Sequence, residues 1–255
     1  MGVRPAGDVD YESAGGHYAT VRRPEPRFAA RVRRAIGGAS SLVNVGAGAG
    51  SYEPDDVVVT AVEPSASMRS QRAVHLVPAI DAVAEDLPFA DRTFDAALAS
   101  VTVHQWRDLG RGLRELRRVT RGPVVVLTFD PEPLGRFWLG EYAPELMARE
   151  SGRMPPIGRI TGILGGTAEV ETVPIPADCV DGFAEAYFGR PEAFLDDRVR
   201  RAQSAWRFVD DETERRSVAA LRAGLADGSW DRRHGELRSA PEYRGALRMV
   251  VAHPA

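Results

Sequence analysis

The sequence predicts an α/β fold in which helices cover a doubly wound, mainly parallel sheet. Short runs of valine, leucine and alanine recur along the chain. Such near-continuous apolar runs are typical of strands that are buried on both faces. Helical patterns lie between the runs, and alternation of strand and helix is the pattern of a parallel α/β sheet.

The elements follow one another in a regular order. Residues 27–36 predict an amphipathic helix with arginines opposite its apolar side, and Gly37-Gly38 ends it. Leucines at 109, 113 and 116 form a second helical stripe. The runs that predict strands are 41–45, 57–62, 79–84, 94–99 and 123–129, with two more near 169–175 and 246–252.

Composition excludes several classes of protein. The 255 residues, 44% of them hydrophobic, are enough for a sizeable core and one to two domains. Thirty-three basic and 36 acidic residues give a net charge of −3, which argues against a general nucleic-acid binder. All basic residues are arginine, so the chain has no lysine for a Schiff base or a P-loop.

The sequence also predicts a cytoplasmic location. The single cysteine, Cys179, excludes a disulfide framework and a cysteine-rich zinc site, and it suits a reducing compartment. No histidine spacing suggests a metal site. No apolar run reaches the roughly 18 residues of a membrane-spanning helix. Residues 1–16 are polar and glycine-rich, unlike a signal peptide.

A glycine-rich segment follows the first predicted strand. It reads Asn44-Val45-Gly46-Ala47-Gly48-Ala49-Gly50. Alternate glycines let the backbone turn sharply and let a ligand approach it, at the end of a doubly wound sheet where ligands bind. Ser51 stands where a dehydrogenase fingerprint has its third glycine, which disfavours a nicotinamide dehydrogenase.

Acidic residues follow the next two predicted strands. Glu63 ends the second predicted strand, 17 residues after Gly46. A carboxylate at this position can accept hydrogen bonds from both hydroxyls of a ribose. Glu85-Asp86-Leu87 follows the third. A carboxylate there can accept a hydrogen bond from the amino group of an adenine, and the Leu87 side chain can pack on the adenine ring. Three such features in the right order are more specific than any one of them.

This order resembles the class I S-adenosylmethionine-dependent methyltransferases, in particular the small-molecule enzymes of ubiquinone and menaquinone biosynthesis. The resemblance covers about residues 18–130 and implies a seven-stranded, Rossmann-like sheet. It implies S-adenosyl-L-methionine as cofactor, S-adenosyl-L-homocysteine as product and a small methyl acceptor. By resemblance, the glycines flank the amino-acid part, Glu63 holds the ribose, Met68 lies near the adenine, and Asp86 and Leu87 border it. The full set of predicted cofactor-binding residues is Tyr18, Asn44, Gly46, Ala47, Gly48, Glu63, Pro64, Met68, Asp86, Leu87 and Ser100.

The chain departs from the family in two places. The family commonly has Asp or Glu where this chain has Asn44, so one charge is missing. Only the eleven residues 46–56 connect the first two strands, and Pro54 interrupts them. This length is near the minimum for a parallel crossover, so we expect the usual first helix to be about one turn.

The domain organisation follows from the same comparison. Residues 1–26 are expected to close over the cofactor site, with Tyr18 against the methionine part or on the surface. Residues 27–255 form the methyltransferase domain, with helical caps inserted near 132–167 and 181–240. A long helical stretch is expected over 181–225, interrupted at 189–191. Its aromatics line an acceptor pocket or form plain core.

His104 is the predicted catalytic residue. It follows the fourth predicted strand, where an imidazole could deprotonate the acceptor at neutral pH. Trp106 beside it could form a wall of the pocket. The alternative is a histidine that caps the next helix and a tryptophan buried beneath it, because many methyl transfers need positioning more than a base.

We therefore expect methyl transfer to O, N or activated C of a small acceptor, of the kind used in secondary metabolism. The alternative is an S-adenosylmethionine-binding protein without methyl transfer, either a non-methylating cyclase or an interaction partner. The expected partner is the small acceptor alone, without nucleic acid or membrane. The expected oligomeric state is a monomer or a homodimer.

Overall fold

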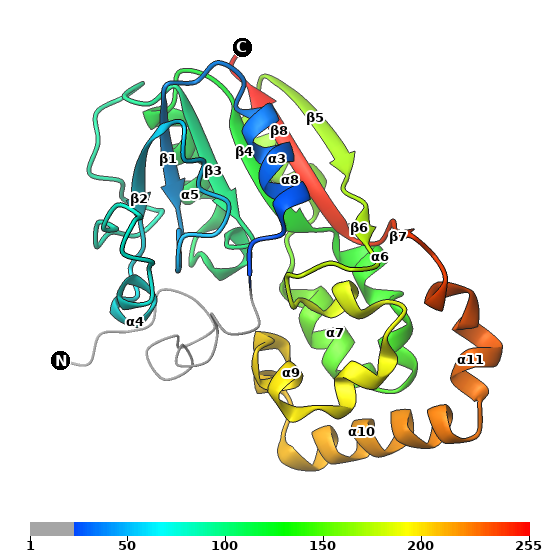
Figure 1. The fold of residues 1–255 in the computed structure, drawn as a ribbon. Coiled ribbons are helices and arrows are strands. Elements are labelled where there is room, and N and C mark those ends of the chain that lie inside the picture. The colour runs from blue at the N-terminus through cyan, green and yellow to red at the C-terminus, as the bar shows by residue number, and fades with distance from the viewer. Residues whose placement is uncertain (1–22) are drawn as a thin grey trace.

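The computed structural model describes residues 23–255, and its centre is a six-stranded sheet (Figure 1). Strands β2 (Val58–Val62), β1 (Ser41–Val45), β3 (Ala96–Ser100) and β4 (Val124–Phe129) run parallel in that order. Strand β8 (Leu247–His253) lies antiparallel between β4 and β5 (Thr167–Thr172). The α/β class and the mainly parallel sheet are confirmed.

The strand predicted over residues 79–84 forms only at one point. Ile80 makes an isolated parallel bridge with Val62, where its N–H donates to the Ala61 carbonyl and its own carbonyl accepts from Glu63. Pro78 precedes this bridge and has no N–H to extend a ladder. Within residues 23–255 the main sheet therefore has six strands, with a single bridge in place of the seventh.

The strand predicted over residues 169–175 is split by Pro174. Its first part is β5, and its second is β6 (Ile175–Pro176), which pairs with β7 (Glu242–Tyr243) in a separate two-stranded sheet. The break turns the chain from the main sheet into the cap.

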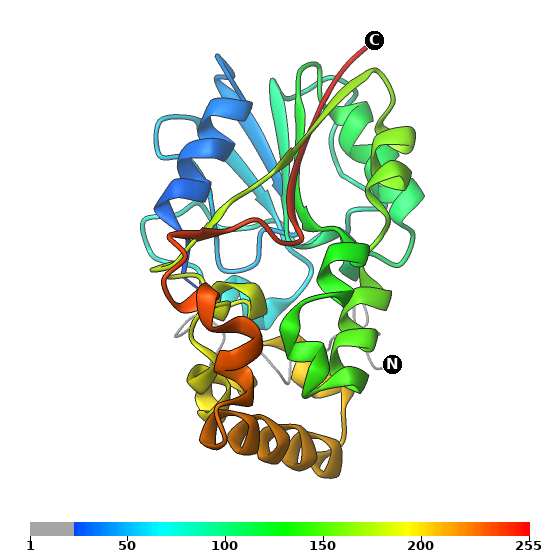
Figure 2. The ribbon, with the colours of Figure 1, turned by 90° about the vertical axis from the view of Figure 1, so that its right-hand side faces the viewer.

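Helices cover both faces of the sheet (Figure 2). Helix α3 (Pro26–Ala35) lies on one face, and α5 (Leu109–Val119) and α8 (Ile157–Leu164) lie on the other. Because side chains alternate along a strand, Leu42 of β1 packs in the α3 layer and Val43 in the α5 layer. The helices predicted at 27–36 and around Leu109 are present.

A helical cap lies beyond the carboxyl ends of the parallel strands (Figure 1). Two insertions build it, and the second packs on the first where the 3₁₀ helix η6 (Ser204–Phe208) contacts α7 (Pro144–Arg153). The first contributes α6 (Pro131–Gly135), η3 (Trp138–Glu141) and α7 (Pro144–Arg153). The second contributes η4 (Ala184–Tyr187), η5 (Pro191–Leu195), α9 (Asp197–Arg201), η6 (Ser204–Phe208), α10 (Asp211–Ala226), α11 (Ser229–His234) and η7 (Gly235–Arg238).

Two expectations about the cap need correction. Helix α8 falls within the predicted insertion 132–167, but it packs on α5 and β8 and belongs to the sheet layers. The predicted long helical stretch 181–225 is mostly short 3₁₀ segments before α10. Pro191 starts η5, and the side chains of Asp196 and Asp210 cap the starts of α9 and α10, which divides the stretch into separate helices.

Two expectations lie outside the described part. Residues 1–22 of the predicted N-terminal segment 1–26, Tyr18 among them, lie outside the described residues, and so does their predicted contact with the cofactor. In residues 23–255, no helix is both long and apolar enough to cross a membrane.

Candidate cofactor site

The glycine segment leaves β1 in a conformation that requires glycine. Gly46 has φ +70°, and a Cβ there would lie 2.0 Å from Thr102 Oγ1. Gly48 has φ +52°. The N–H groups of Gly46 and Ala47 both donate to the Val62 carbonyl, at 2.9 and 3.0 Å. The loop is therefore held against the carboxyl end of β2.

Glu63 joins β2 to this loop. Its side chain is buried, and its two carboxylate oxygens accept from Gly48 N at 2.8 Å and from Ser65 N at 2.9 Å. Burial is the largest influence on its pKa and raises it, although the two backbone hydrogen bonds oppose the shift. Each carboxylate oxygen keeps a further lone pair that can accept a ligand hydroxyl.

Met68 lies over the same loop. Helix α4 (Ala66–Ser70) begins after Ser65, whose hydroxyl accepts from Met68 N at 3.2 Å. Met68 is buried, and its methyl carbon would lie 3.3 Å from a Cβ at Gly48. Arg69 donates to the Glu63 and Pro64 carbonyls at 2.8 and 2.9 Å. The structure thus brings Gly48, Glu63, Pro64 and Met68 together.

Asn44 is buried near the end of β1, and the Glu53 carboxylate lies beside it, although Asn44 itself lacks the charge that the family commonly has there. Its amide nitrogen donates to Glu53 Oε1 at 2.9 Å. Its Oδ1 is buried without a hydrogen-bond partner in the structure. Glu53 comes from the short connection between β1 and β2. No pattern in the sequence indicates this contact, because it depends on how the connection folds back.

That connection contains no helix at all. Residues 46–57 form turns and irregular backbone. Tyr52 takes φ +64°, packs its ring near Phe28 and donates its hydroxyl to Asp181 of the cap at 2.7 Å. The expected one-turn helix is therefore absent from this part of the structure, and side-chain contacts hold the loop instead.

Asp86 and Leu87 lie along α5 and do not join this group. The Asp86 side chain is 84% exposed and lies 4.0 Å from Arg111. Leu87 donates its N–H to Glu115 at 3.0 Å and is buried in the core layer under the sheet. The strand stops at Ile80, so these residues fall beyond its end. The Leu87 side chain is part of the buried cluster on the α5 face, and the expected contacts of Asp86 and Leu87 with the adenine stay predictions.

His104 lies in a short 3₁₀ helix after β3. Strand β3 ends at Ser100, and η2 (Val103–Gln105) follows Thr102, which touches Gly46. His104 Nε2 lies 2.9 Å from Gln105 Nε2. Since an amide N–H only donates, His104 Nε2 accepts here. This contact occupies one of the two ring nitrogens that a general base could use.

Trp106 packs beneath the next helix. A Cβ at Gly112 of α5 would lie 2.5 Å from Trp106 Cε3, so the indole lies directly against that helix. Trp106 also adjoins the core layer on the α5 face. This packing matches the alternative that the sequence left open, in which the tryptophan lies beneath the next helix.

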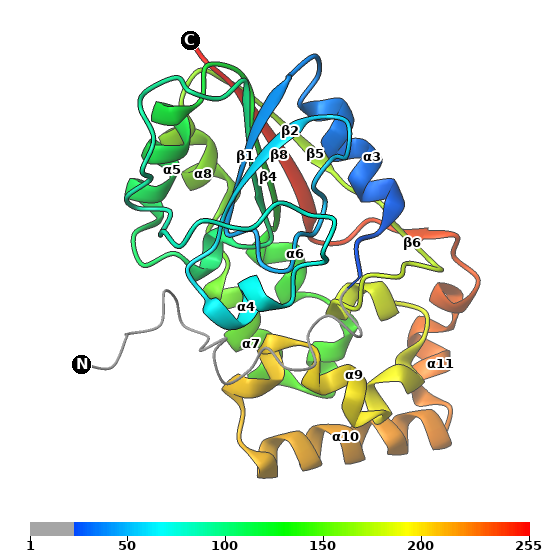
Figure 3. The same ribbon diagram turned by 60° about the vertical axis from the view of Figure 1, so that its left-hand side comes forward.

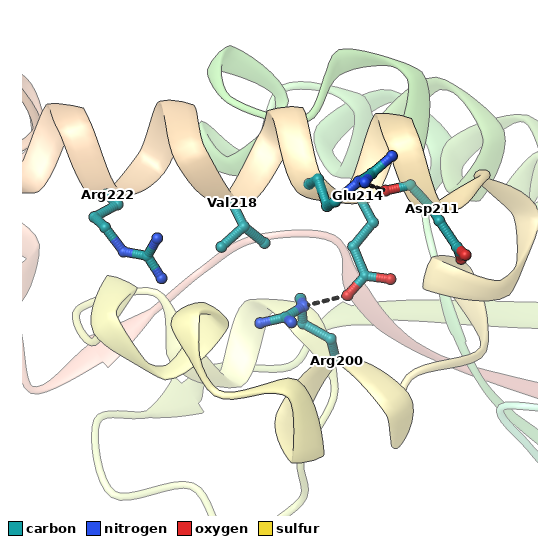
Figure 4. Close-up of a pocket in the computed structure, with 6 residues that line it drawn as sticks. Arg200, Asp211, Glu214, Val218 and Arg222 are labelled. Carbon is teal, nitrogen blue, oxygen red and sulfur yellow. Dashed lines mark hydrogen bonds and ion pairs between the residues drawn. The ribbon is translucent and has the colours of Figure 1, made fainter.

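A charged pocket of about 430 Å³ lies elsewhere, in the cap between α9 and α10 (Figure 4). Arg200 donates to Glu214 at 2.6 Å across it. None of the predicted site residues lines it. Its lining residues are Arg200, Asp211, Glu214, Arg215, Val218 and Arg222. Within residues 23–255, no group of three or more His, Cys, Asp or Glu residues could hold a metal ion.

Comparison with known proteins indicates a methyltransferase domain. Residues 43–126 match a family model described as a methyltransferase domain. A demethylmenaquinone methyltransferase of Mycolicibacterium vanbaalenii is 36% identical over 115 residues, which are 44% of this chain and 47% of that protein. A 2-methyl-6-phytyl-1,4-hydroquinone methyltransferase of rice is 29% identical over 41% of this chain and 33% of that protein. The chain thus spans less than half the length of these relatives.

Two solved structures extend the comparison to the whole chain. A protein of Anabaena variabilis, provisionally described as a methyltransferase from an antibiotic biosynthesis pathway, is 28% identical with a TM-score of 0.85. The match covers 92% of this chain and 99% of that one. The [4+2]-cyclase SpnF is 16% identical with a TM-score of 0.54, over 96% of this chain and 92% of that one, which shows a shared fold alone.

Proposed function

Because the chain belongs to the class I S-adenosylmethionine-dependent methyltransferases, we propose that it transfers a methyl group to a small acceptor bound beneath the cap. One observation carries the proposal. The structure brings the glycine loop, Glu63 and Met68 together at the carboxyl ends of β1 and β2. In doubly wound sheets this edge is where such ligands bind.

The residues at this edge fit the cofactor of the family. Glu63 has spare lone pairs for the ribose hydroxyls, and Met68 offers a buried apolar surface. The orphaned Asn44 Oδ1 can accept from the ammonium group of the amino-acid part. When bound, S-adenosylmethionine supplies an electrophilic sulfonium methyl group. The chain then has to orient the acceptor in line with it and exclude water.

The cap would form the part of the site that binds the methyl acceptor. Helices α7 and α9 lie at the same end of the sheet as α4 (Figure 3). Gln203 Nε2 and Trp206 Nε1, beside and within η6, are buried donors without a hydrogen-bond partner in the structure. Buried donors normally have partners, so they favour an acceptor that carries oxygen on an apolar body. The hydroquinone and menaquinone relatives agree with this class.

We expect His104 to position the acceptor and not to act as its base. Gln105 occupies His104 Nε2, so His104→Gln should lower turnover by less than about a hundredfold and keep the acidic limb of the pH–rate profile. Cofactor affinity should stay unchanged. Steady-state kinetics between pH 5 and 9 measure both quantities. A loss of about 10²–10⁴-fold together with loss of that limb would instead identify a general base.

Transfer of tritium from S-adenosyl-[methyl-³H]methionine tests the function directly. We suggest methylhydroquinone and 1,4-naphthohydroquinone as probe acceptors, with Glu63→Ala as the inactive control. Label that passes into the organic phase with the wild-type chain alone would support the proposal. Saturable cofactor binding without transfer to either quinol would favour the alternative, a cofactor-binding protein that does not methylate such acceptors. The cyclase SpnF shares the fold.

A further inference from the structure

The connection between β1 and β2 carries a buried ion pair. Glu53 lies in this connection and Arg72 follows α4, and their side chains are only 2% and 4% exposed. Arg72 Nη2 donates to both Glu53 carboxylate oxygens, at 3.0 and 2.8 Å. Removing one member of a buried pair leaves the other charge uncompensated, so both members are needed.

The pair is bonded to the glycine loop and to β1. Arg72 Nη1 donates to the Gly48 carbonyl at 3.4 Å, and Arg72 Nε donates to the Val77 carbonyl at 3.0 Å. On the other side, Asn44 donates its amide to Glu53. The pair therefore connects the end of β1, the middle of the glycine loop and the segment after α4.

The neighbouring residue anchors the same connection to the cap. Tyr52 is buried and bonds Asp181, while Glu53, the next residue, bonds Asn44 and Arg72. With no helix in residues 46–57, these two side chains replace the support that a helix would give.

We propose that Glu53 and Arg72 are positioning residues that hold the Gly48 backbone in its cofactor-binding conformation, and that position 44 must be an amide because Glu53 already supplies the carboxylate. The inference rests on the proposed cofactor site. Asn44→Asp restores the acid that the family commonly has, yet here it places a second carboxylate within hydrogen-bond distance of the first.

Titration calorimetry with S-adenosylhomocysteine and with adenosine tests this. N44D should weaken S-adenosylhomocysteine binding by about tenfold or more, the range for a lost charged hydrogen bond. It should change adenosine affinity much less, because adenosine lacks the amino-acid part beside the glycine loop. The double variant N44D/E53Q restores one acid and one amide, so it removes the repulsion between two carboxylates but also breaks the Glu53–Arg72 pair. It should recover only part of the S-adenosylhomocysteine affinity that N44D loses. E145Q, which removes an exposed ion pair with Arg216 in the cap, is the matched control.

Several outcomes would overturn the inference. Wild-type affinity in N44D would show that position 44 need not be an amide. Equal losses for both ligands would show general damage to the domain. If N44D does not fold, the double variant carries the test alone, and its failure to fold and to bind S-adenosylhomocysteine contradicts the pairing. Absence of binding by the wild-type chain would refute the proposed function itself, and so remains distinct from these results.

Discussion

Glu63→Ala is expected to weaken binding of S-adenosylhomocysteine by about 1.5–3 kcal/mol, or roughly 10–100-fold. The variant removes the carboxylate that joins Gly48 and Ser65 and that the ribose hydroxyls would share. Titration calorimetry at neutral pH measures the loss. Glu63→Gln keeps one acceptor oxygen, so its affinity should fall between those of the wild type and Glu63→Ala.

The control for the Glu63 variant is the same substitution at a glutamate far from the proposed cofactor site. Glu171→Ala removes an ion pair with Arg31 at the far edge of the sheet, where Glu171 is 44% exposed, and should leave the affinity unchanged. If Glu63→Ala binds as tightly as the wild type, Glu63 serves only to fasten the glycine loop to α4.

The stability of the chain should fall as the pH rises from about 5 to 8. Glu185 is fully buried in the cap, and its carboxylate oxygens accept from Ala246 N at 2.9 and 3.0 Å. Burial raises its pKa to about 7, while the Ala246 hydrogen bond and Arg248 oppose the shift. Because the folded state holds this proton more tightly than the unfolded state, its stabilising contribution is complete below pH 4.5 and is lost through pH 7.

The expected size of this loss is about 3 kcal/mol in the free energy of unfolding. Urea titrations at pH 5.5, 6.5 and 8 measure it. Glu185→Gln should flatten the dependence. Glu192→Gln should not, because Glu192 pairs with Arg238 and its pKa is lowered, so it is already charged at pH 5.5. A wild-type chain that is equally stable at pH 5.5 and 8 would contradict the assignment.

Patterns local in the sequence predicted most of the sheet. The runs that became β1, β2, β3, β4 and β8 are apolar enough to be recognised, and the glycines that follow β1 do take left-handed backbone angles. Glu63 could be placed because it directly follows a strand. In these cases residues that are close in the sequence determine the local backbone structure.

The errors arose where distant residues decide. Glu53 meets Asn44 and Arg72 only because the connection folds back, and no spacing in the sequence indicates that contact. The strand expected at 79–84 ends after one bridge, because Pro78 has no N–H with which to extend a ladder. Apolar character alone could not distinguish a pocket wall from core at Trp106, which packs on Gly112.

The most direct test of the central claim is titration of the wild-type chain with S-adenosylhomocysteine and, separately, with NAD. Glycine loops after a first strand serve both kinds of ligand, and the structure distinguishes them by the contacts around Gly48, Glu63 and Met68. We expect saturable one-to-one binding of S-adenosylhomocysteine and no binding of NAD. Binding of NAD with no heat from S-adenosylhomocysteine would contradict it.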